Sequence, residues 1–380
     1  MSISPLFLLS VLCVSVTACS TLPMASKGSP FAPITQLTQP TQVTSPTAKI
    51  QAGRWLFIVE QGTGKSRISS LVLTDMNGQH SKILTQRTGT IFSLSPSRDG
   101  RYATFTAQSP NDFPHIFTLE IATGRTTLIT PQRHNHFSGN LSPNNQQLLI
   151  SSSLDDNPEI YLTDNQGNDP QRLTHDAAAD FAPVWLPDAS GFIFTSDRAG
   201  KLRPQLYQYT FDKVVQSSSQ TNQPNQSAVT STGKIKALTQ NRYSSNAKIS
   251  PNGQWISYIA KDAQGDIVYR VQSLATGQGN AWRNDGYADA MTFSADGQWL
   301  VYASVNTDKN TNSNAIIQTI DAIPVAQLVN VEKTADTLAL PKPAFSLNFS
   351  DRAMQDIFGL DKGSDDKHQK WVIREPYLLF

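Results

Sequence analysis

Cysteine is nearly absent from the sequence. The two cysteines, Cys13 and Cys19, both lie at the start of the chain. If Cys13 leaves with a signal peptide and Cys19 is acylated, as argued below, the mature protein has no pair of thiols to oxidise. A disulfide-stabilised scaffold is therefore excluded.

An excess of one sign of charge is also missing. The sequence has 31 lysines and arginines against 30 aspartates and glutamates, a formal net charge of +1. Because no basic stripe stands out either, nucleic acid is not an expected partner. After the N-terminal apolar segment, no apolar run approaches the length needed to span a membrane.

Signature motifs of several enzyme classes are missing as well. No G-x-S-x-G elbow occurs, which excludes a serine-hydrolase domain of that type. The segment GTGKS ends like a phosphate-binding loop, but Val59 stands where the first glycine belongs. The acidic segment 151–174 lacks the ligand order and the closing glutamate of a calcium loop. No cofactor is predicted.

The acidic segment fits a β-hairpin instead. Residues 159–163 read as a strand, 165–168 as a turn and 171–174 as the returning strand. Aspartates at other turns, Asp99, Asp188 and Asp296, are expected to accept hydrogen bonds from the turn backbone.

This pattern recurs along the chain. Six turn residues each precede a short apolar strand, and they are spaced by 47, 45, 46, 62 and 44 residues. Removing the 18 polar residues 216–233 from the long interval leaves 44. Several short strands per period of this length are typical of propeller blades, so an all-β, six-bladed β-propeller is predicted. The turn residues are Gly53, Gly100, Asn145, Gly191, Gly253 and Gly297.

Residues 216–233 have almost no apolar side chains and are predicted to be a disordered insertion between the two outer strands of one blade. The most specific repeat elements are NPEIYLTDNQGNDPQRLT, FAPVWLPDASGFIFTSDRAG, LSPSRDGRYATFTA and ISPNGQWISYIA. They resemble the repeats of the TolB-type β-propeller family over about residues 36–321. The resemblance implies a role near the Tol-Pal envelope system, where the propeller meets the peptidoglycan-associated lipoprotein. This chain departs from TolB by having a tether in place of the preceding α/β domain and by carrying its own lipobox.

The first residues predict a bacterial lipoprotein signal. Residues 6–14 form an apolar stretch of signal-peptide length, and the following VTACS resembles a lipobox. We expect Cys19 to be lipidated and, with Ser20 after it, the protein to be anchored in the outer membrane on its periplasmic side. The first residues, MSISP, lack the usual lysine or arginine. An ordinary secretory signal with a chance cysteine is the alternative.

Two routes to ring closure remain open from the sequence. Residues 34–38 could pair beside residues 315–320 in the last blade, or residues 325–329 could take that place. Residues 350–358 read as a short helix, and the apolar residues after 370 could dock on the propeller or engage a partner. The expected organisation is a signal peptide at 1–18, a tether at 19–33 that could extend to 48, a propeller at 34–325 and a C-terminal extension at 326–380.

One histidine pair could bind a metal. His134 and His136 are alternate residues, so on a strand both rings would face the same way. A catalytic zinc site normally has three protein ligands, and the sequence offers no clear third one. No resident metal is predicted, and the pair remains the weaker interpretation.

The predicted binding surface is a rim of loops. The loops that join the outer strand of one blade to the inner strand of the next gather at one mouth of the channel. Their aromatic, arginine and carboxylate groups would suit a peptide or protein. We therefore expect a non-catalytic, lipid-anchored propeller that binds an envelope protein such as a peptidoglycan-associated lipoprotein. The alternative is a metal-dependent lyase or hydrolase acting on a saccharide at this mouth. The candidate rim residues are Arg133, His134, His136, Asp180, Tyr243, Asn246, Tyr287 and Asp289.

Overall fold

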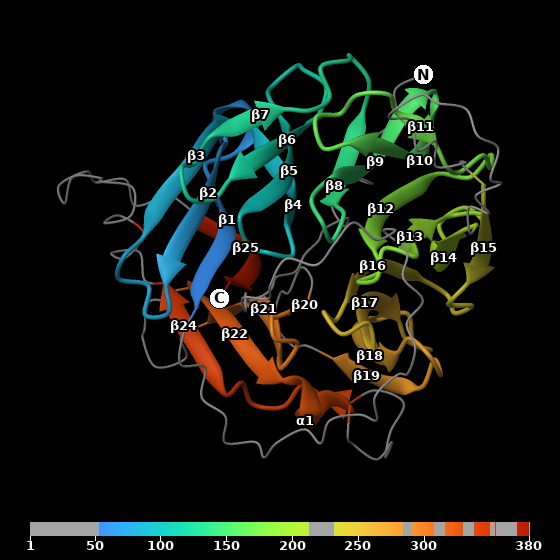
Figure 1. Ribbon diagram of the computed structural model, residues 1–380. Helices are drawn as coiled ribbons and strands as arrows, with labels where there is room; N and C mark the ends of the chain where they lie inside the picture. The colour runs from blue at the N-terminus through green and yellow to red at the C-terminus, as the bar shows by residue number, and fades with distance from the viewer. Residues whose placement is uncertain are drawn as a thin grey trace, which may run out of the picture.

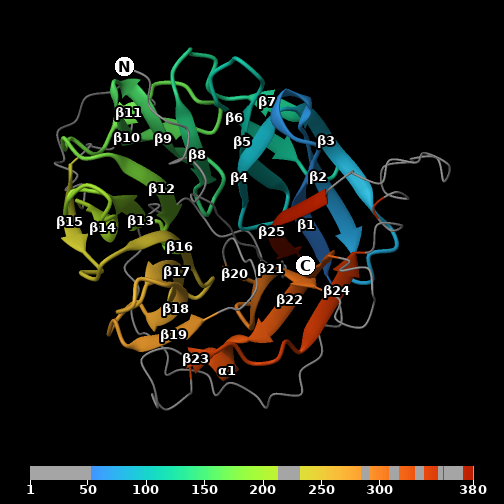
Figure 2. The same cartoon turned by 180° about the vertical axis from the view of Figure 1, so that it is seen from behind.

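Six β-sheets surround a central axis in the computed structural model, seen from its two sides in Figures 1 and 2. The structure describes residues 53–212, 232–283, 291–307, 316–329, 338–349, 354 and 371–379. The predicted all-β, six-bladed propeller is confirmed.

Each sheet is one blade, with its first strand nearest the axis (Figure 1). Blade 1 has β25 (Trp371–Leu379), β1 (Arg54–Gln61), β2 (Ile68–Asp75) and β3 (Lys82–Thr88). Blade 2 has β4 (Thr90–Pro96), β5 (Tyr102–Gln108), β6 (His115–Glu120) and β7 (Thr126–Leu128). Blade 3 has β8 (His136–Leu141), β9 (Gln147–Asp155), β10 (Asn157–Asp164) and β11 (Gln171–Arg172).

The other three blades follow the same order. Blade 4 has β12 (Asp180–Trp185), β13 (Gly191–Ser196), β14 (Gln205–Phe211) and β15 (Gly233–Ala237). Blade 5 has β16 (Ser244–Ile249), β17 (Trp255–Lys261), β18 (Ile267–Ser273), β19 (Gly279–Arg283) and β23 (Leu338–Ala339). Blade 6 has β20 (Thr292–Phe293), β21 (Trp299–Thr307), β22 (Ile316–Pro324) and β24 (Phe345–Phe349). Two short helical segments are the 3-10 turn η2 (Gly64–Ser66) and the helix α1 (Val325–Val329).

The hydrophobic core is divided among the blade interfaces. The second strands are buried on both faces, which is why β1 and β13 read as continuous apolar runs. Among the described residues, the buried side chains form six clusters, each between neighbouring blades. Aromatic stacking adds to this packing, as between Phe192 and Tyr209, whose ring centroids are 4.8 Å apart.

The turns between first and second strands repeat one hydrogen-bonding pattern. Asp99 Oδ1 accepts from the backbone N–H of Arg101 at 3.1 Å, and Asp296 Oδ1 from that of Gln298 at 2.9 Å. Asp188 does the same in blade 4, accepting from the N–H of Ser190 at 3.0 Å. The predicted role of these three aspartates is confirmed.

The turn of blade 4 differs from the prediction at one residue. Gly100, Gly253 and Gly297 have φ of 65°, 71° and 70°, as left-handed turn residues. In blade 4 the corresponding residue is Ala189, with φ of 59°, so the assignment of Gly191 to the turn is wrong. Gly191 instead begins β13, where an added Cβ would lie 2.0 Å from the carbonyl oxygen of Tyr209.

The hairpin predicted within residues 151–174 is confirmed. Strands β10 and β11 pair antiparallel, with Tyr161 opposite Arg172. The position of the polar insertion is also confirmed, because β14 pairs with β15 and Phe211 lies opposite Gly233. The predicted end of the insertion at residue 233 is wrong, because Gly233 is the first residue of β15, while residues 216–231 lie outside the described part of the chain.

The C-terminal region closes the ring. Strand β25 pairs with β1 and becomes the innermost strand of blade 1. Strand β24 pairs with β22 and takes the place beside residues 316–320. Residues 325–329, one of the two candidates for the closing strand, instead form α1. The segment 34–38 lies outside the described residues.

The predicted boundary at residue 325 is therefore wrong, because β23, β24 and β25 belong to blades 5, 6 and 1. β23 pairs parallel with β19, as a fifth strand at the outer edge of blade 5. The helix predicted at 350–358 falls mostly outside the described residues, with only Met354 described.

Candidate functional site

Inner strands and hairpins build the predicted rim together. His136, Asp180 and Ser244 are the first residues of β8, β12 and β16. Hydrogen bonds connect the starts of β8 and β16 to the hairpins between the second and third strands of the preceding blade. The backbone N–H of His136 donates to the carbonyl of Pro114 at 3.2 Å, and that of Ser244 to the carbonyl of Pro204 at 2.8 Å. One mouth of the channel therefore combines both sets of loops.

Arg133 and His134 are exposed on the β7–β8 loop, as expected of rim residues. The Arg133 guanidinium lies 3.9 Å from Asp112 Oδ1 and 5.6 Å from the centroid of the Phe113 ring. Because 76% of the Arg133 side chain is exposed, this contact leaves most of its donors available to a partner.

His136 is buried rather than presented at the rim, with an exposed fraction of 0%. Its Nε2 lies 3.2 Å from the carbonyl oxygen of Gln132 and its Nδ1 lies 2.9 Å from Ser152 Oγ. A carbonyl only accepts, so Nε2–H donates and Nδ1 accepts from the serine hydroxyl. Burial lowers the pKa of His136 to about 4, which keeps the ring neutral at pH 7.

This geometry does not form the metal site considered from the sequence. Both ring nitrogens of His136 already contact protein groups, whereas His134 lies on the exposed loop before it. Within the described residues, no group of three His, Cys, Asp or Glu side chains could hold a metal ion.

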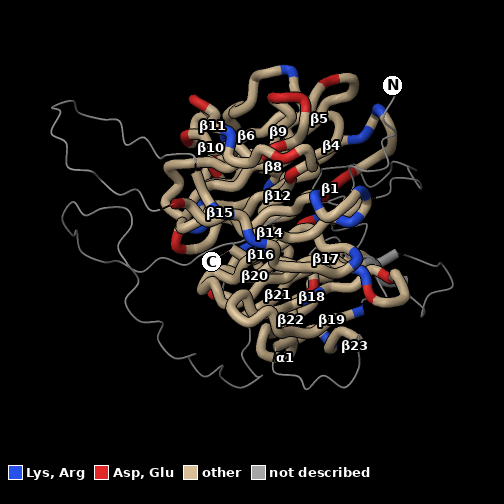
Figure 3. Tube along the Cα trace, turned by 90° about the vertical axis from the view of Figure 1, so that its right-hand side faces the viewer, with Lys and Arg blue, Asp and Glu red and all other residues tan. Residues whose placement is uncertain are grey.

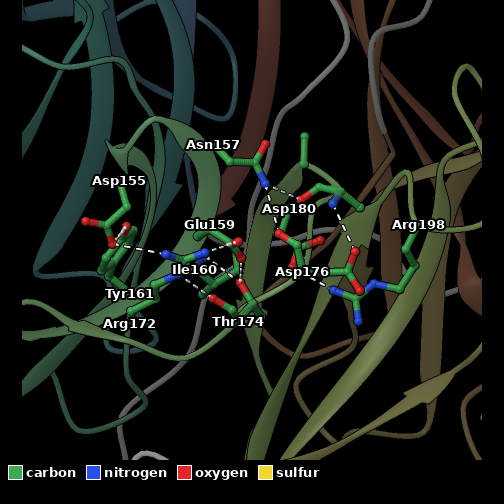
Figure 4. Close-up of polar contacts among 12 residues, drawn as sticks. Asp155, Asn157, Glu159, Ile160, Tyr161, Arg172, Thr174, Asp176, Asp180 and Arg198 are labelled. Carbon is green, nitrogen blue, oxygen red and sulfur yellow. Dashed lines mark hydrogen bonds and ion pairs between the residues drawn. The ribbon is translucent and has the colours of Figure 1, made fainter.

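Asp180 is also buried, and it binds Arg198 (Figure 4). Arg198 Nη2 donates to Asp180 Oδ2 at 2.7 Å, and Arg198 Nε donates to Ser196 Oγ at 2.9 Å. Burial raises the pKa of Asp180 to about 6, even though Arg198 favours the charged carboxylate. Asp180 therefore stabilises the rim from a buried position, and its carboxylate is not exposed to a partner.

Tyr243 and Asn246 differ in accessibility. Tyr243 is half-buried, its hydroxyl accepts from Ser245 Oγ at 3.1 Å, and Lys261 Nζ lies 5.4 Å from its ring centroid. Asn246 is buried in a bulge of β16 with φ of 58°, and its N–H donates to Thr195 Oγ1 at 3.3 Å. The remaining two candidates, Tyr287 and Asp289, lie outside the described residues.

The structure adds a buried polar network that the sequence analysis missed (Figure 4). Glu159, fully buried, accepts from Arg172 Nη2 and from Thr174 Oγ1, each at 2.5 Å. Thr174 Oγ1 also accepts the backbone N–H of Ile160 at 2.9 Å. The sequence does contain a recurring pair of an aliphatic residue and threonine. The hydrogen bonds that the threonine makes could not be predicted, because their partners lie on the adjacent strand.

The same threonine position recurs in neighbouring blades. Thr130 Oγ1 accepts the N–H of Ile116 at 2.8 Å, and Thr239 Oγ1 accepts the N–H of Leu206 at 2.9 Å. In blade 4, Thr239 Oγ1 also donates to Gln205 Oε1 at 2.9 Å. These contacts hold the ends of the outer strands at the rim in a fixed position.

A second missed feature is an aromatic pair between blades 3 and 4. The half-buried rings of Phe137 and Phe181 meet edge to face, with centroids 5.2 Å apart. Phe137 directly follows the buried His136, and Phe181 directly follows the buried Asp180. Because successive strand residues point to opposite faces, each aromatic side chain points away from its buried neighbour.

Arg98 crosses the opposite mouth of the channel. Its Nη1 donates to the carbonyl of Pro187 at 2.9 Å in blade 4, and its Nη2 lies 3.4 Å from the carbonyl of Pro251 in blade 5. These bonds join the first turns of three blades over a cavity of about 60 Å³. The cavity is lined by Pro96, Arg98, Asn140, Leu141, Pro143, Val184, Trp185, Pro187, Ile249, Ser250 and Pro251.

Within the described segments, none of the helices has the length and apolar character needed to cross a membrane.

Comparisons with known proteins agree with this architecture. A family model for the TolB beta propeller domain matches residues 47–322. The Tol-Pal system protein TolB of Francisella tularensis subsp. tularensis is 28% identical over 240 residues, covering 55% of this chain and 54% of that protein. The chain thus spans about half the length of the curated relatives it matches.

Solved structures show the same fold. The crystal structure of TolB from Acinetobacter baumannii aligns with a TM-score of 0.62 and 22% identity, covering 86% of this chain and 66% of that one. A chain in the crystal structure of a nidogen/laminin complex aligns with a TM-score of 0.54 at 11% identity, covering 86% of this chain and 98% of that one. Because the family model covers well over half of the chain, the protein belongs to the TolB β-propeller family.

Proposed function

We propose that this protein is a non-catalytic, lipid-anchored β-propeller that binds an envelope protein through the rim of one channel mouth. The match of residues 47–322 to the TolB propeller family carries the proposal. The relatives named as Tol-Pal system proteins point to a partner of the peptidoglycan-associated lipoprotein type. In this proposal the protein faces the periplasm from the outer membrane.

The geometry of the rim supports binding over catalysis. His136 and Asp180 are engaged with the protein itself, and His136 also contacts the carbonyl oxygen of Gln132 in the loop that exposes Arg133 and His134. Rigid strands that present exposed cationic and aromatic groups suit protein recognition. No contact in the described part of the chain favours the saccharide lyase alternative over this function.

Binding can be tested with purified components. The purified chain is titrated with the peptidoglycan-associated lipoprotein of the same organism in a calorimeter. We expect saturable binding that Tyr243→Ala and Tyr287→Ala each weaken about tenfold, a loss of about 1.4 kcal/mol. Tyr102→Ala, at a half-buried tyrosine of the opposite mouth, is the matched control and should bind like wild type. No binding by the wild-type chain would remove the Tol-Pal link.

Anchoring is tested separately. Metabolic labelling with a radioactive fatty acid, followed by membrane fractionation, compares wild type with Cys19→Ser and Cys13→Ser. We expect Cys19→Ser to lose both the label and the membrane fraction, because Cys19 carries the acyl chains in this proposal. Cys13→Ser should keep both, since Cys13 leaves with the signal peptide. Unlabelled wild-type protein would refute lipidation.

A further inference from the structure

Four exposed cations lie on the rim between blades 4 and 5. Lys201 and Arg203 come from the β13–β14 hairpin, Arg242 from the β15–β16 loop and Lys261 from the end of β17. In the part of the chain that the structure describes, none of the four forms an ion pair with a carboxylate. These residues, together with Leu202, are called the basic patch below.

Hydrogen bonds bring the three segments of the basic patch together. The carbonyl of Pro204 accepts the N–H of Ser244 at 2.8 Å, which joins the hairpin to the start of β16. The carbonyl of Asn241 accepts from Gln205 Nε2 at 2.7 Å, beside Arg242. The N–H of Lys261 donates to the carbonyl of Tyr243 at 3.3 Å. The cations therefore belong to one continuous surface, although they are up to 60 residues apart in sequence.

Neighbouring carboxylates do not neutralise the basic patch. Asp262 and Asp266 lie 3.0 and 3.3 Å from Arg283. Asp180 lies 2.7 Å from Arg198. Asp197 accepts the backbone N–H of Ala179 at 2.9 Å and keeps its negative charge, so the four cations of the basic patch still outnumber it. In the side view of Figure 3, positions of Lys and Arg are interspersed with positions of Asp and Glu along the chain trace, and the whole chain has a net charge of only +1. The basic patch is thus a local excess of positive charge.

Leu202 adds an apolar group at the tip of the hairpin. It is 66% exposed, with φ of 64°, and the hairpin is closed by the Arg203 N–H donating to the carbonyl of Gly200 at 3.0 Å. The exposed side chain therefore contributes little buried apolar area to the fold, and it is accessible to another molecule.

We propose that the basic patch binds an acidic segment of the protein partner, with an apolar side chain of that segment covering Leu202. This inference rests on the proposed function and adds the position and the chemistry of the contact. Unpaired cations attract an acidic partner and orient it. Leu202 and the half-buried Tyr243 supply the apolar contact that anchors it. An anionic lipid surface fits less well, because interfacial binding uses a broad apolar face rather than a single leucine.

Photo-cross-linking in intact cells tests the inference. A photoreactive amino acid replaces Leu202 in the full chain, and the adducts are identified by mass spectrometry. We expect a protein adduct whose cross-linked peptide is acidic. Adding Lys201→Glu and Arg203→Glu should reduce its yield at least tenfold.

The outer edge of the same blade provides a matched control. Lys234, Ile235 and Lys236 repeat the order cation, apolar residue, cation on β15, and Ile235 is 39% exposed. Lysines there have a separate explanation, because they protect an exposed strand edge from pairing. The Lys234→Glu/Lys236→Glu chain should give the Leu202 adduct in wild-type yield, and a probe at Ile235 should give no such adduct.

The outcomes separate this inference from the proposed function. Protein adducts at a second probe on His134, with none at position 202, would leave the propeller a binding module and overturn the role of the basic patch. A position 202 adduct that survives the charge reversal would overturn it too, as would capture of lipid alone. If neither probe captures protein, both this inference and the proposed function fail.

Discussion

His136 and Asp180 occupy equivalent positions in blades 3 and 4, and burial shifts the pKa values of their side chains in opposite directions. Burial disfavours the charged form of both, so the pKa of His136 falls to about 4 and that of Asp180 rises to about 6. The stability from neutral His136 is complete above its ordinary pKa of 6.5 and is lost as pH falls toward 4. The contribution of Asp180 is complete below 3.8 and is lost as pH rises through 6.

Replacing His136 isolates its share of this pH dependence. We expect the free energy of unfolding of wild type to exceed that of His136→Gln by an amount that grows by up to about 3 kcal/mol from pH 4 to pH 7. Urea titrations at several pH values measure it. His134→Gln, on the exposed loop, is the control and should track wild type. A constant difference between wild type and His136→Gln would show that His136 does not titrate in this range.

The buried pair of Arg172 and Glu159 predicts a large loss from a single change. Arg172→Met leaves a carboxylate with 0% exposure without its cation, so a loss of about 3 kcal/mol in the free energy of unfolding is expected. Arg125→Met is the matched control, because Arg125 is 75% exposed where it pairs with Glu120. It should cost about 0.5 kcal/mol or less. Similar losses for both variants in chemical denaturation would contradict the argument.

At the scale of elements, the period and the turn chemistry were readable from the sequence. Asp99, Asp188 and Asp296 form the predicted turns because their bonds are local. The turn residue of blade 4 was predicted wrongly because glycine is the usual residue at positive φ, which favoured Gly191, whereas Ala189 adopts that conformation. The burial of His136 and Asp180 could not be predicted, because it depends on Ser152 of the neighbouring strand β9 and on Arg198 of the β13–β14 hairpin.

The turn of blade 4 therefore offers a stabilising substitution. Ala189 has φ of 59°, which an L-residue adopts at a cost, so Ala189→Gly should raise the free energy of unfolding by up to about 1 kcal/mol. Gly253→Ala, in the matching turn of blade 5, should lower it by about 1 kcal/mol. An added Cβ at Gly253 would make only an ordinary contact, 3.6 Å from Pro187. Thermal melting of the two variants should shift in opposite directions, and shifts of the same sign would contradict this reading.

At the scale of the whole molecule, the six blades were predictable and the closure of the ring was not. A period in the sequence predicts the number of blades, because most strands of each blade come from one local run of the chain. Closure depends on which distant segment completes the ring, and the sequence left two candidates open, residues 34–38 and 325–329. The structure selects β25, whose Tyr377 hydroxyl donates to the carbonyl of Leu94 at 2.8 Å in the next blade.

The closing strand should therefore determine whether the ring holds together. Without residues 371–380, β1 would have no inner neighbour, and the buried Trp371, Tyr377 and Leu378 would be missing from two blade interfaces. We expect this truncated chain to lose its cooperative thermal transition and to be digested rapidly by protease.

A milder substitution in β25 and an added peptide test the same prediction without relying on the truncated chain alone. Tyr377→Phe removes only the hydrogen bond to Leu94 and should keep the transition with a loss of about 1 kcal/mol. A synthetic peptide of residues 371–380, added in excess, should restore protease resistance to the truncated chain, because binding to the folded state alone stabilises it by mass action. A truncated chain that melts at the wild-type temperature without peptide would show that the ring closes without β25.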